Sequence, residues 1–427
     1  MGDIDASERL KKEIGLFSAT AIGVGAVIGA GIFVITGIVA GFAGPAVIIS
    51  LIIAGVIAYF TAVSFSKLSE SITREGGTYA FVYELVSPTA GFLAGWMWIL
   101  SYTFVGATVA LGFANYLIQY LPWLHVKIIA VAVCFAFTLL NYFGVKESTI
   151  VNNVFVSTKI IVLLFFIVLG LGYINLNFFT PFFISTEEWG ILQGTALIFF
   201  AYTGFARITT VAEEVKNPTR IIPKSILLTL IISITLYVLT SYVAIGLVGH
   251  LTLANSDSPL SSAIAVTGNP ITVLLISIGA MIATASVLLT AILGVSRVAF
   301  AMARNNDLPI YLKKIHTKYG TPYIAVWLAG WLMIAAVILT PNLSQVAALS
   351  SFASLLYYAM ANVAAINLSM KTGKFSPITP FIGLFSCLGL LIFLSFYAWI
   401  IGIAGLVLGF FYYFIRKSNK KGSKAKA

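Results

Sequence analysis

Charged residues are scarce in this chain: Asp, Glu, Lys and Arg make up 9% of its 427 residues, against about a quarter in an average soluble domain. Cysteine is scarcer still, with Cys134 and Cys387 each inside an apolar run. The spacing of these two cysteines does not match a zinc site. Their apolar surroundings favour two buried thiols over a disulfide. A Walker A loop and an HExxH motif are also absent, which leaves an ATP-driven pump or a metalloprotease without support. We expect no cofactor and no metal.

What the chain has instead is apolar length, since 60% of its residues are hydrophobic. A hydrocarbon core of about 30 Å needs about 20 apolar residues per helix. The apolar runs therefore predict an all-α membrane protein with about 12 transmembrane helices. The expected spans are 16–43, 45–66, 86–118, 127–144, 149–172, 189–212, 223–248, 271–303, 323–340, 344–369, 378–395 and 397–415.

Positive charge is distributed unevenly between the two sides of these spans. With the N-terminus inside, Lys127 alone falls in an outside loop, and Lys159, Arg207 and Arg297 fall within spans; the rest of the 25 Lys and Arg residues are inside. This bias predicts a multi-pass protein of the cell membrane with both termini cytoplasmic. The net charge of +11 then needs no nucleic acid, and we expect a solvated basic tail beside anionic lipid.

Three glycines interrupt the first span, in the stretch GAVIGAGIF at 25–33. Glycine costs about 1 kcal/mol against alanine inside a helix, so its placement needs a reason. Gly25 and Gly29 are four residues apart and would suit close packing between helices. The alternative is that the helix unwinds here, which a membrane protein tolerates where the backbone lines a cavity. This stretch alone does not decide between the two.

A second irregular stretch, FFAYTGFARITTVAEEVKNPTRIIP at 199–223, occupies the sixth span. Interrupted segments at matching positions, spans one and six, indicate two inverted repeats with a substrate site between them. Breaking a helix frees N–H groups at the start of one half and carbonyls at the end of the other. The N–H groups suit a carboxylate and the carbonyls suit an ammonium. An α-amino acid carries both groups.

These stretches, with EGGTYAFVYELVSPTAG at 75–91 and AMARNNDLP at 301–309, resemble the amino acid–polyamine–organocation superfamily of secondary transporters, and its proton-coupled prokaryotic members in particular. The resemblance implies a leucine-transporter-like fold with a 5+5 inverted repeat and two further C-terminal helices. The implied segments are a cytoplasmic tail at 1–15, repeats at 16–172 and 189–369, the last two helices at 378–415, and a basic cytoplasmic tail at 416–427.

The resemblance also implies a substrate site, residue by residue. The N–H groups of Gly29, Ala30 and Gly31 would take the carboxylate. The carbonyls of Val27, Phe200 and Thr203 would face the ammonium, and the Phe200 ring would cap the substrate from outside. Relatives often have Ser or Thr where this chain has Ala30. The missing hydroxyl would change the affinity for the substrate more than the transport reaction itself.

Lys159 lies near the middle of span five, where a charge is costly and marks a functional candidate. Burial penalises the ammonium form, so such an amine can load and release a proton. In proton-coupled relatives a lysine at this position replaces a sodium ion, and Ser286 is its expected neighbour. Some relatives have an acidic proton-binding residue in span six, at the position where this chain has Ala206. Its absence makes Lys159 the main candidate for the group that binds the proton. Arg297 is expected at the inner interface, and Arg207 pairs with Glu213 or Glu214 or lines the inner vestibule.

The sequence thus predicts a transporter, not an enzyme, that moves amino acids with protons by alternating access. No Asp or Glu lies in the middle of a predicted span, which favours small neutral substrates over cationic amino acids or polyamines. Sodium coupling and uncoupled exchange remain open alternatives on the same fold. A non-transporting membrane sensor is the alternative from another class, and the two broken spans argue against it.

Overall fold

The computed structural model describes residues 14–72, 76–144, 149–184 and 189–424. Within these ranges the regular elements are helices, and the extended pairing is a single parallel bridge between Ile14 and Val215. The prediction of an all-helical protein is therefore confirmed. Residues 1–13 of the predicted N-terminal tail and residues 425–427 of the predicted C-terminal tail lie outside the described part of the chain.

The first half of the chain forms eight main helical segments in order. They are α1 (Leu16–Val27), the π-helical turn η2 (Gly31–Ile35), α2 (Thr36–Ala43), α3 (Val47–Ser71), α4 (Thr78–Leu85), α5 (Pro88–Leu117), α6 (Val126–Tyr142) and α7 (Thr149–Leu171). The second half contains α8 (Gly190–Ile198), η5 (Phe199–Glu214), α9 (Pro218–Ala254), α10 (Pro259–Ile264), α11 (Pro270–Arg304), α12 (Tyr323–Leu339), α13 (Leu343–Thr372), α14 (Ile378–Leu391) and α15 (Phe396–Lys424).

Each predicted span overlaps one of these helices or a consecutive group of them, and several ends differ. Helix α3 continues to Ser71 rather than 66, and α9 begins at Pro218 rather than 223. Helix α9 continues past the predicted end at 248 through Gly249, whose φ of 74° kinks it. Helix α14 ends at Leu391 rather than 395. Helix α15 runs on to Lys424, so much of the predicted basic tail is helical. Lys and Arg are good helix formers, and a helix can therefore outlast its apolar run.

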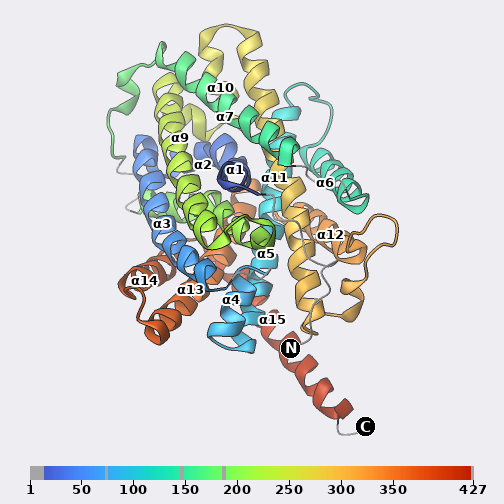
Figure 1. Ribbon diagram of the computed structural model, residues 1–427. Coiled ribbons are helices and arrows are strands. Elements are labelled where there is room, and N and C mark those ends of the chain that lie inside the picture. The colour runs from blue at the N-terminus through green and yellow to red at the C-terminus, as the bar shows by residue number, and fades with distance from the viewer. Residues whose placement is uncertain (1–13, 73–75, 145–148, 185–188, 425–427) are drawn as a thin grey trace.

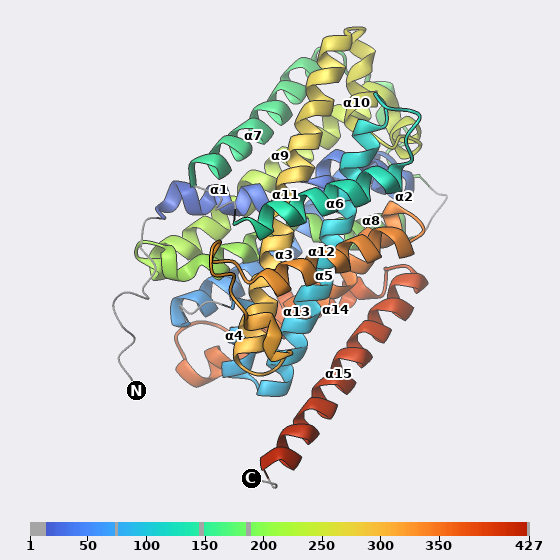
Figure 2. The same cartoon turned by 90° about the vertical axis from the view of Figure 1, so that its right-hand side faces the viewer.

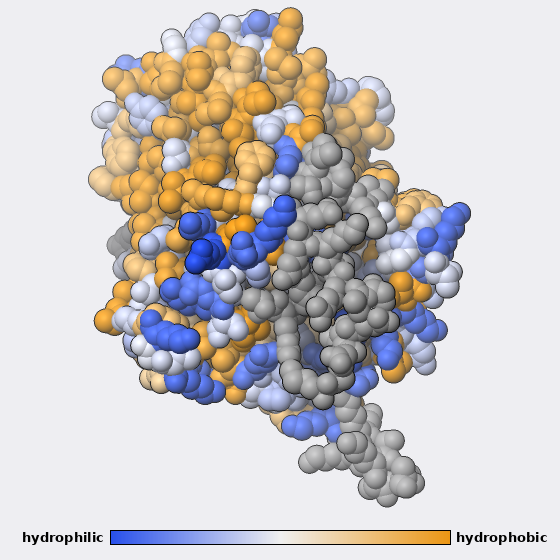
Figure 3. Space-filling model, viewed as in Figure 1, coloured by the Kyte–Doolittle hydropathy of each residue, from blue (hydrophilic) through white to orange (hydrophobic). Residues whose placement is uncertain are grey.

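Apolar surface covers the sides of the helical bundle rather than being confined to its interior. Eight described stretches are long and apolar enough to cross a membrane, and α6, α12 and α14 are shorter apolar helices. On α7 the side chains of Ile161 and Val168 are 63% and 71% exposed. Figure 3 shows hydrophobic residues over the upper part of one face and hydrophilic ones towards the lower end. Lipid, not water, is the solvent that suits such a face.

Helix α5 lies in the middle of the bundle and packs against α11 on one side and α13 on the other (Figures 1 and 2). Small residues make this close approach possible, as expected between helices in lipid. A Cβ on Gly95 would lie 2.9 Å from the Met302 sulfur of α11, and one on Gly106 would overlap the Met333 side chain of α12. A Cβ on Gly112 would lie 3.1 Å from Val34 and 3.4 Å from Ala30 of the first span. Helices α4 and α10 mark opposite ends of the molecule.

The start of the first span is tied to the end of the sixth. The Ile14 amide donates to the Glu214 carbonyl at 3.1 Å, and the Lys216 amide donates to the Ile14 carbonyl at 2.9 Å. Ile14 and Val215 are both buried at this bridge. Spans one and six, which are the two irregular ones, are thereby held side by side over their length, with α1 packed along η5.

Gly204 sets the distance between these two spans and provides a test of the fold. A Cβ there would lie 2.5 Å from the Val27 nitrogen and as close to the Ala26 backbone, and backbone atoms cannot rotate away. Gly204→Ala should destabilise the protein by about 1–3 kcal/mol, the usual cost of overpacking. Thermal unfolding in detergent, followed by size-exclusion chromatography, measures this. Gly389→Ala is the control, because a Cβ there meets nothing within 4 Å; equal melting points for the two variants would contradict the packing.

Candidate functional site

The first span is broken at Ile28, between α1 and the π-helical turn. Ile28 has an extended backbone with φ −73° and ψ 104°, and Ala30 returns to helical angles. Two glycines beside the break also allow close contact. A Cβ on Gly29 would lie 2.9 Å from Val287, and one on Gly31 would overlap Ala201. Both interpretations of the glycines are therefore correct: the helix breaks, and its glycines let spans six and eight approach the exposed backbone.

The break frees carbonyls at the end of α1, and side chains from other helices occupy them. The Lys159 Nζ donates to the Gly25 carbonyl at 2.6 Å, and the Tyr237 hydroxyl donates to the Val27 carbonyl at 2.8 Å. In an unbroken helix these carbonyls would accept from N–H groups four residues on. The negative end of the α1 dipole points in this direction, which favours a cation such as the Lys159 ammonium.

The sixth span changes its winding rather than unwinding. Helix α8 ends at Ile198, and residues Phe199–Glu214 continue as a 3₁₀-helix of 16 residues, far longer than such helices usually are. The expectation of an unwound sixth span is wrong in this respect. A 3₁₀-helix keeps the backbone hydrogen-bonded inside the hydrocarbon, which an extended chain would not. Its tighter turns rotate the side chains relative to those of an α-helix.

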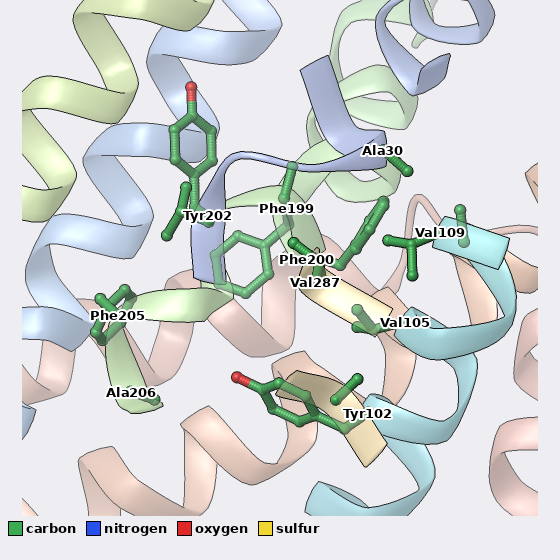
Figure 4. Close-up of a cluster of buried hydrophobic side chains, with 14 of the residues drawn as sticks. Ala30, Tyr102, Val105, Val109, Phe199, Phe200, Tyr202, Phe205, Ala206 and Val287 are labelled. Carbon is green, nitrogen blue, oxygen red and sulfur yellow. The ribbon is translucent and has the colours of Figure 1, made fainter. Parts of the chain in front are cut away.

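A small cavity lies between the two irregular spans and α5. It is lined by Ala26, Val27, Gly29, Ala30 and Gly31 from span one, Tyr102, Val105 and Val109 from α5, Phe200, Ala201, Thr203 and Gly204 from η5, and Val287 from α11. Figure 4 shows Tyr102, Val105 and Val109 one above another along the side of α5 that faces Phe200 and Val287. All six residues predicted to bind substrate line this cavity, and α5 adds Tyr102, Val105 and Val109.

The cavity is nearly closed. Its volume is about 10 Å³, which is about the room that one water molecule needs. Phe200 is 5% exposed and Val287 is 4% exposed, so the walls pack against one another. An amino acid enters only if these walls separate.

The carbonyls expected to face an ammonium already accept hydroxyl groups. The Thr203 hydroxyl donates to the Phe200 carbonyl at 2.6 Å, and the Tyr358 hydroxyl donates to the Thr203 carbonyl at 2.6 Å. A carbonyl oxygen has two lone pairs, and the Thr203 carbonyl also accepts from the Tyr102 hydroxyl at 3.4 Å. Tyr237 and Tyr358 were not singled out in the sequence. A tyrosine in mid-span signals a need for a polar partner, but the partner itself is a property of the folded chain.

The two residues predicted for proton coupling lie in different surroundings. Lys159 is 1% exposed and bonds to α1 two residues before Val27, which lines the cavity. The Ser286 hydroxyl donates to the Ala283 carbonyl of its own helix at 3.0 Å. The structure thus links Lys159 directly to the broken span, while Ser286 is the residue before Val287 in the cavity wall.

Arg207 lies beside Tyr102, one of the residues that line the cavity. It is 8% exposed, it donates to the Thr290 carbonyl of α11, and its guanidinium carbon lies 5.5 Å from the centre of the Tyr102 ring. Tyr102 in turn stacks on Trp98, with 4.1 Å between ring centres. The contacts that the structure shows for the Arg207 guanidinium thus join η5 to α11 and to α5. Arg297 is exposed on the surface of α11.

Comparison with known proteins places the chain in a family. The Amino acid permease family model matches residues 14–416. The branched-chain amino acid permease BcaP of Bacillus subtilis is 32% identical, over 96% of this chain and 94% of its own length. The uncharacterized transporter Rv1999c of Mycobacterium tuberculosis is 34% identical, over 97% of this chain and 93% of its own length.

Relatives with other named substrates match as well. The methylthioribose transporter of Bacillus subtilis is 32% identical, over 96% of this chain and 94% of its own length. The family model covers nearly all the described residues, both irregular spans included. The chain belongs to the amino acid permease family of the amino acid–polyamine–organocation superfamily, and it is a multi-pass membrane transporter rather than an enzyme.

Proposed function

We propose that this chain imports small neutral amino acids together with protons, by alternating access. The observation that carries the proposal is the junction at the first span. The same break places the cavity-lining backbone of Gly29, Ala30 and Gly31 on one side, and the Gly25 carbonyl that holds Lys159 on the other. Substrate and proton would therefore act on one movable segment.

The substrate would be held at both ends by backbone groups. N–H groups at the start of the second half of span one have no partner within that helix, and they suit the carboxylate. The carbonyls of Val27, Phe200 and Thr203 would face the ammonium, which would replace the hydroxyl groups that they now accept. None of the described residues that line the cavity is Asp or Glu, so a cationic side chain would be buried there without a counter-charge. The valines suit a small aliphatic side chain.

The proton would act through the tether between α7 and α1. A protonated Lys159 donates a charge-assisted hydrogen bond to the Gly25 carbonyl, and such bonds are about twice as strong as neutral ones. Loss of the proton weakens this bond and leaves α1 freer to tilt about Ile28. Tilting of α1 would separate it from Arg207 and Tyr102 and open the cavity inward. A sodium ion at this place would be repelled by the ammonium, which favours protons as the coupling ion.

The packing of the helices supports the inverted repeat. Helices α3 and α9, α5 and α11, and α1 and η5 pack in pairs, and each pair joins corresponding members of the two proposed repeats. In the two proposed repeats α7 corresponds to α13 and α11 corresponds to α5. The contact of α7 with α11 therefore has its counterpart in the contact of α13 with α5. Twelve spans, cytoplasmic termini and a place in the cell membrane belong to this proposal, and the distribution of Lys and Arg supports them.

Replacement of Lys159 tests the coupling. Lys159→Met should abolish uptake driven by a pH gradient in proteoliposomes, while exchange of external for internal substrate stays within about threefold of wild type. The exchange is retained because the cavity residues are untouched. Lys224→Met, at an exposed position on α9, is the control. Full proton-driven uptake by Lys159→Met, or a requirement of the wild type for sodium, would refute proton coupling through this residue.

Enlargement of the cavity tests its role in substrate choice. Val105→Ala removes two methyl groups from the lining, and one methylene is worth about 1–3 kcal/mol in substrate discrimination. The ratio of kcat/KM for leucine to that for alanine should therefore rise about tenfold. Val168→Ala is the matched control, because Val168 is 71% exposed on α7. An unchanged preference in Val105→Ala would place the substrate side chain elsewhere.

A further inference from the structure

Tyr237 lies on α9, behind the lining of the central cavity, and its side chain is fully buried. Its hydroxyl is 2.8 Å from the Val27 carbonyl of span one and 3.3 Å from the Ala201 carbonyl of η5. Val27 and Ala201 both line the cavity. One hydroxyl from a third helix therefore joins the two irregular spans beside the place where the substrate is proposed to bind.

Of these two carbonyls, that of Val27 depends more on the hydroxyl. Val27 is the last residue of α1, and Ile28 after it has an extended backbone. The carbonyls in the last turn of an α-helix have no partner within that helix. Ala201 instead lies inside the 3₁₀-helix of η5, whose winding supplies an N–H group to the carbonyl three residues earlier. A hydroxyl has one hydrogen, and the shorter of the two distances is the one to Val27.

The Val27 carbonyl needs a donor from the protein only while the cavity is closed without a substrate. The closed cavity has a volume of about 10 Å³, which is too little for an amino acid. When the cavity opens to either side, water can pair with the carbonyl. When an amino acid is bound, its ammonium would pair with the carbonyl, and the Tyr237 hydroxyl would still have the Ala201 carbonyl within reach. A carbonyl that is buried in the membrane without any donor is costly.

We propose that the Tyr237 hydroxyl takes the place of the substrate ammonium at the Val27 carbonyl, and so allows the transporter to close and return without an amino acid. This inference rests on the proposed function, because that proposal brings the ammonium to this carbonyl. A cycle of net transport includes one passage without substrate, whereas exchange carries substrate in both directions. Tyr237 is thus a positioning residue that net transport requires and exchange does not.

Tyr202 offers a matched comparison in the same part of the molecule. Its ring centre is 5.1 Å from that of Tyr237, and both side chains are fully buried. The Tyr202 hydroxyl donates at 3.1 Å to the carbonyl of Leu51, which lies inside α3 and not at the end of a helix. Figure 4 shows this hydroxyl pointing away from Phe200 and Val287 of the cavity. Each Tyr→Phe change removes one buried hydroxyl, but only Tyr237→Phe removes it from a carbonyl of the cavity lining.

The test measures exchange and net efflux of radiolabelled L-valine from the same proteoliposomes, at equal pH on both sides. Exchange is started with L-valine in the external buffer, and net efflux is started without it. In Tyr237→Phe the net efflux should fall about tenfold, because the closed transporter without substrate loses a hydrogen bond to a buried carbonyl. Exchange should stay within about twofold of wild type. Tyr202→Phe should keep the wild-type ratio of exchange to net efflux.

Three results would overturn the role of Tyr237. Equal losses of exchange and net efflux in Tyr237→Phe would assign its hydroxyl to general packing. Unchanged net efflux in this variant would show that the Val27 carbonyl needs no donor from α9. A selective loss of net efflux in Tyr202→Phe as well would show that any buried hydroxyl in this region has the same effect. Rates are compared per amount of protein that elutes as a single peak in size-exclusion chromatography.

Failure of this inference and failure of the proposed function give different results. Uptake of L-valine by wild type along a pH gradient, together with normal net efflux in Tyr237→Phe, overturns the role of Tyr237 and leaves the transport proposal standing. Exchange by wild type without net flux under any pH gradient overturns proton-driven import, and the role of Tyr237 with it. Absence of uptake and exchange for every amino acid tested overturns both as well.

Discussion

The requirement that every backbone polar group inside a membrane find a partner governs this structure. A break in a helix at mid-span leaves carbonyls and N–H groups that lipid cannot satisfy. At the end of α1 these carbonyls are met by Lys159 and Tyr237 from two other helices. In the sixth span the backbone avoids the same cost by tightening into a 3₁₀-helix. The two spans solve one physical problem in different ways, and the cavity lies where the solutions meet.

The buried lysine gains its significance from this arrangement. A charged side chain in the middle of a bilayer is expensive, and Lys159 is 1% exposed. Its hydrogen bond to the Gly25 carbonyl places the charge at the negative end of a helix dipole. The Gly25 carbonyl, which helps make the charge tolerable, thus belongs to the helix that ends at the break in the first span.

The central cavity is nearly closed, and aromatic residues pack along its α5 wall. Tyr102 contacts both the Trp98 ring and the Arg207 guanidinium. At Gly112, α5 lies close to Ala30 and Val34 of the first span. The named substrates of relatives differ, so membership of the family does not by itself determine the substrate.

Sequence alone determined the elements, because apolar runs of about 20 residues have few alternatives to a spanning helix. It also located both irregular spans, and it identified Lys159 because a lysine deep in an apolar run is rare. It did not predict the kink at Gly249 or the helix ends at Leu391 and Lys424, since local propensity competes there with the hydropathy signal.

The partners of each polar group were decided by tertiary structure alone. Nothing in the sequence joins Lys159 to Gly25 or Tyr358 to Thr203, which lie in different helices. The winding of Phe199–Glu214 was decided there too, because neighbouring helices determine whether a 3₁₀-helix or an extended chain leaves fewer groups unsatisfied. A sequence specifies which groups need partners, and only the packed helices determine which partners lie within reach.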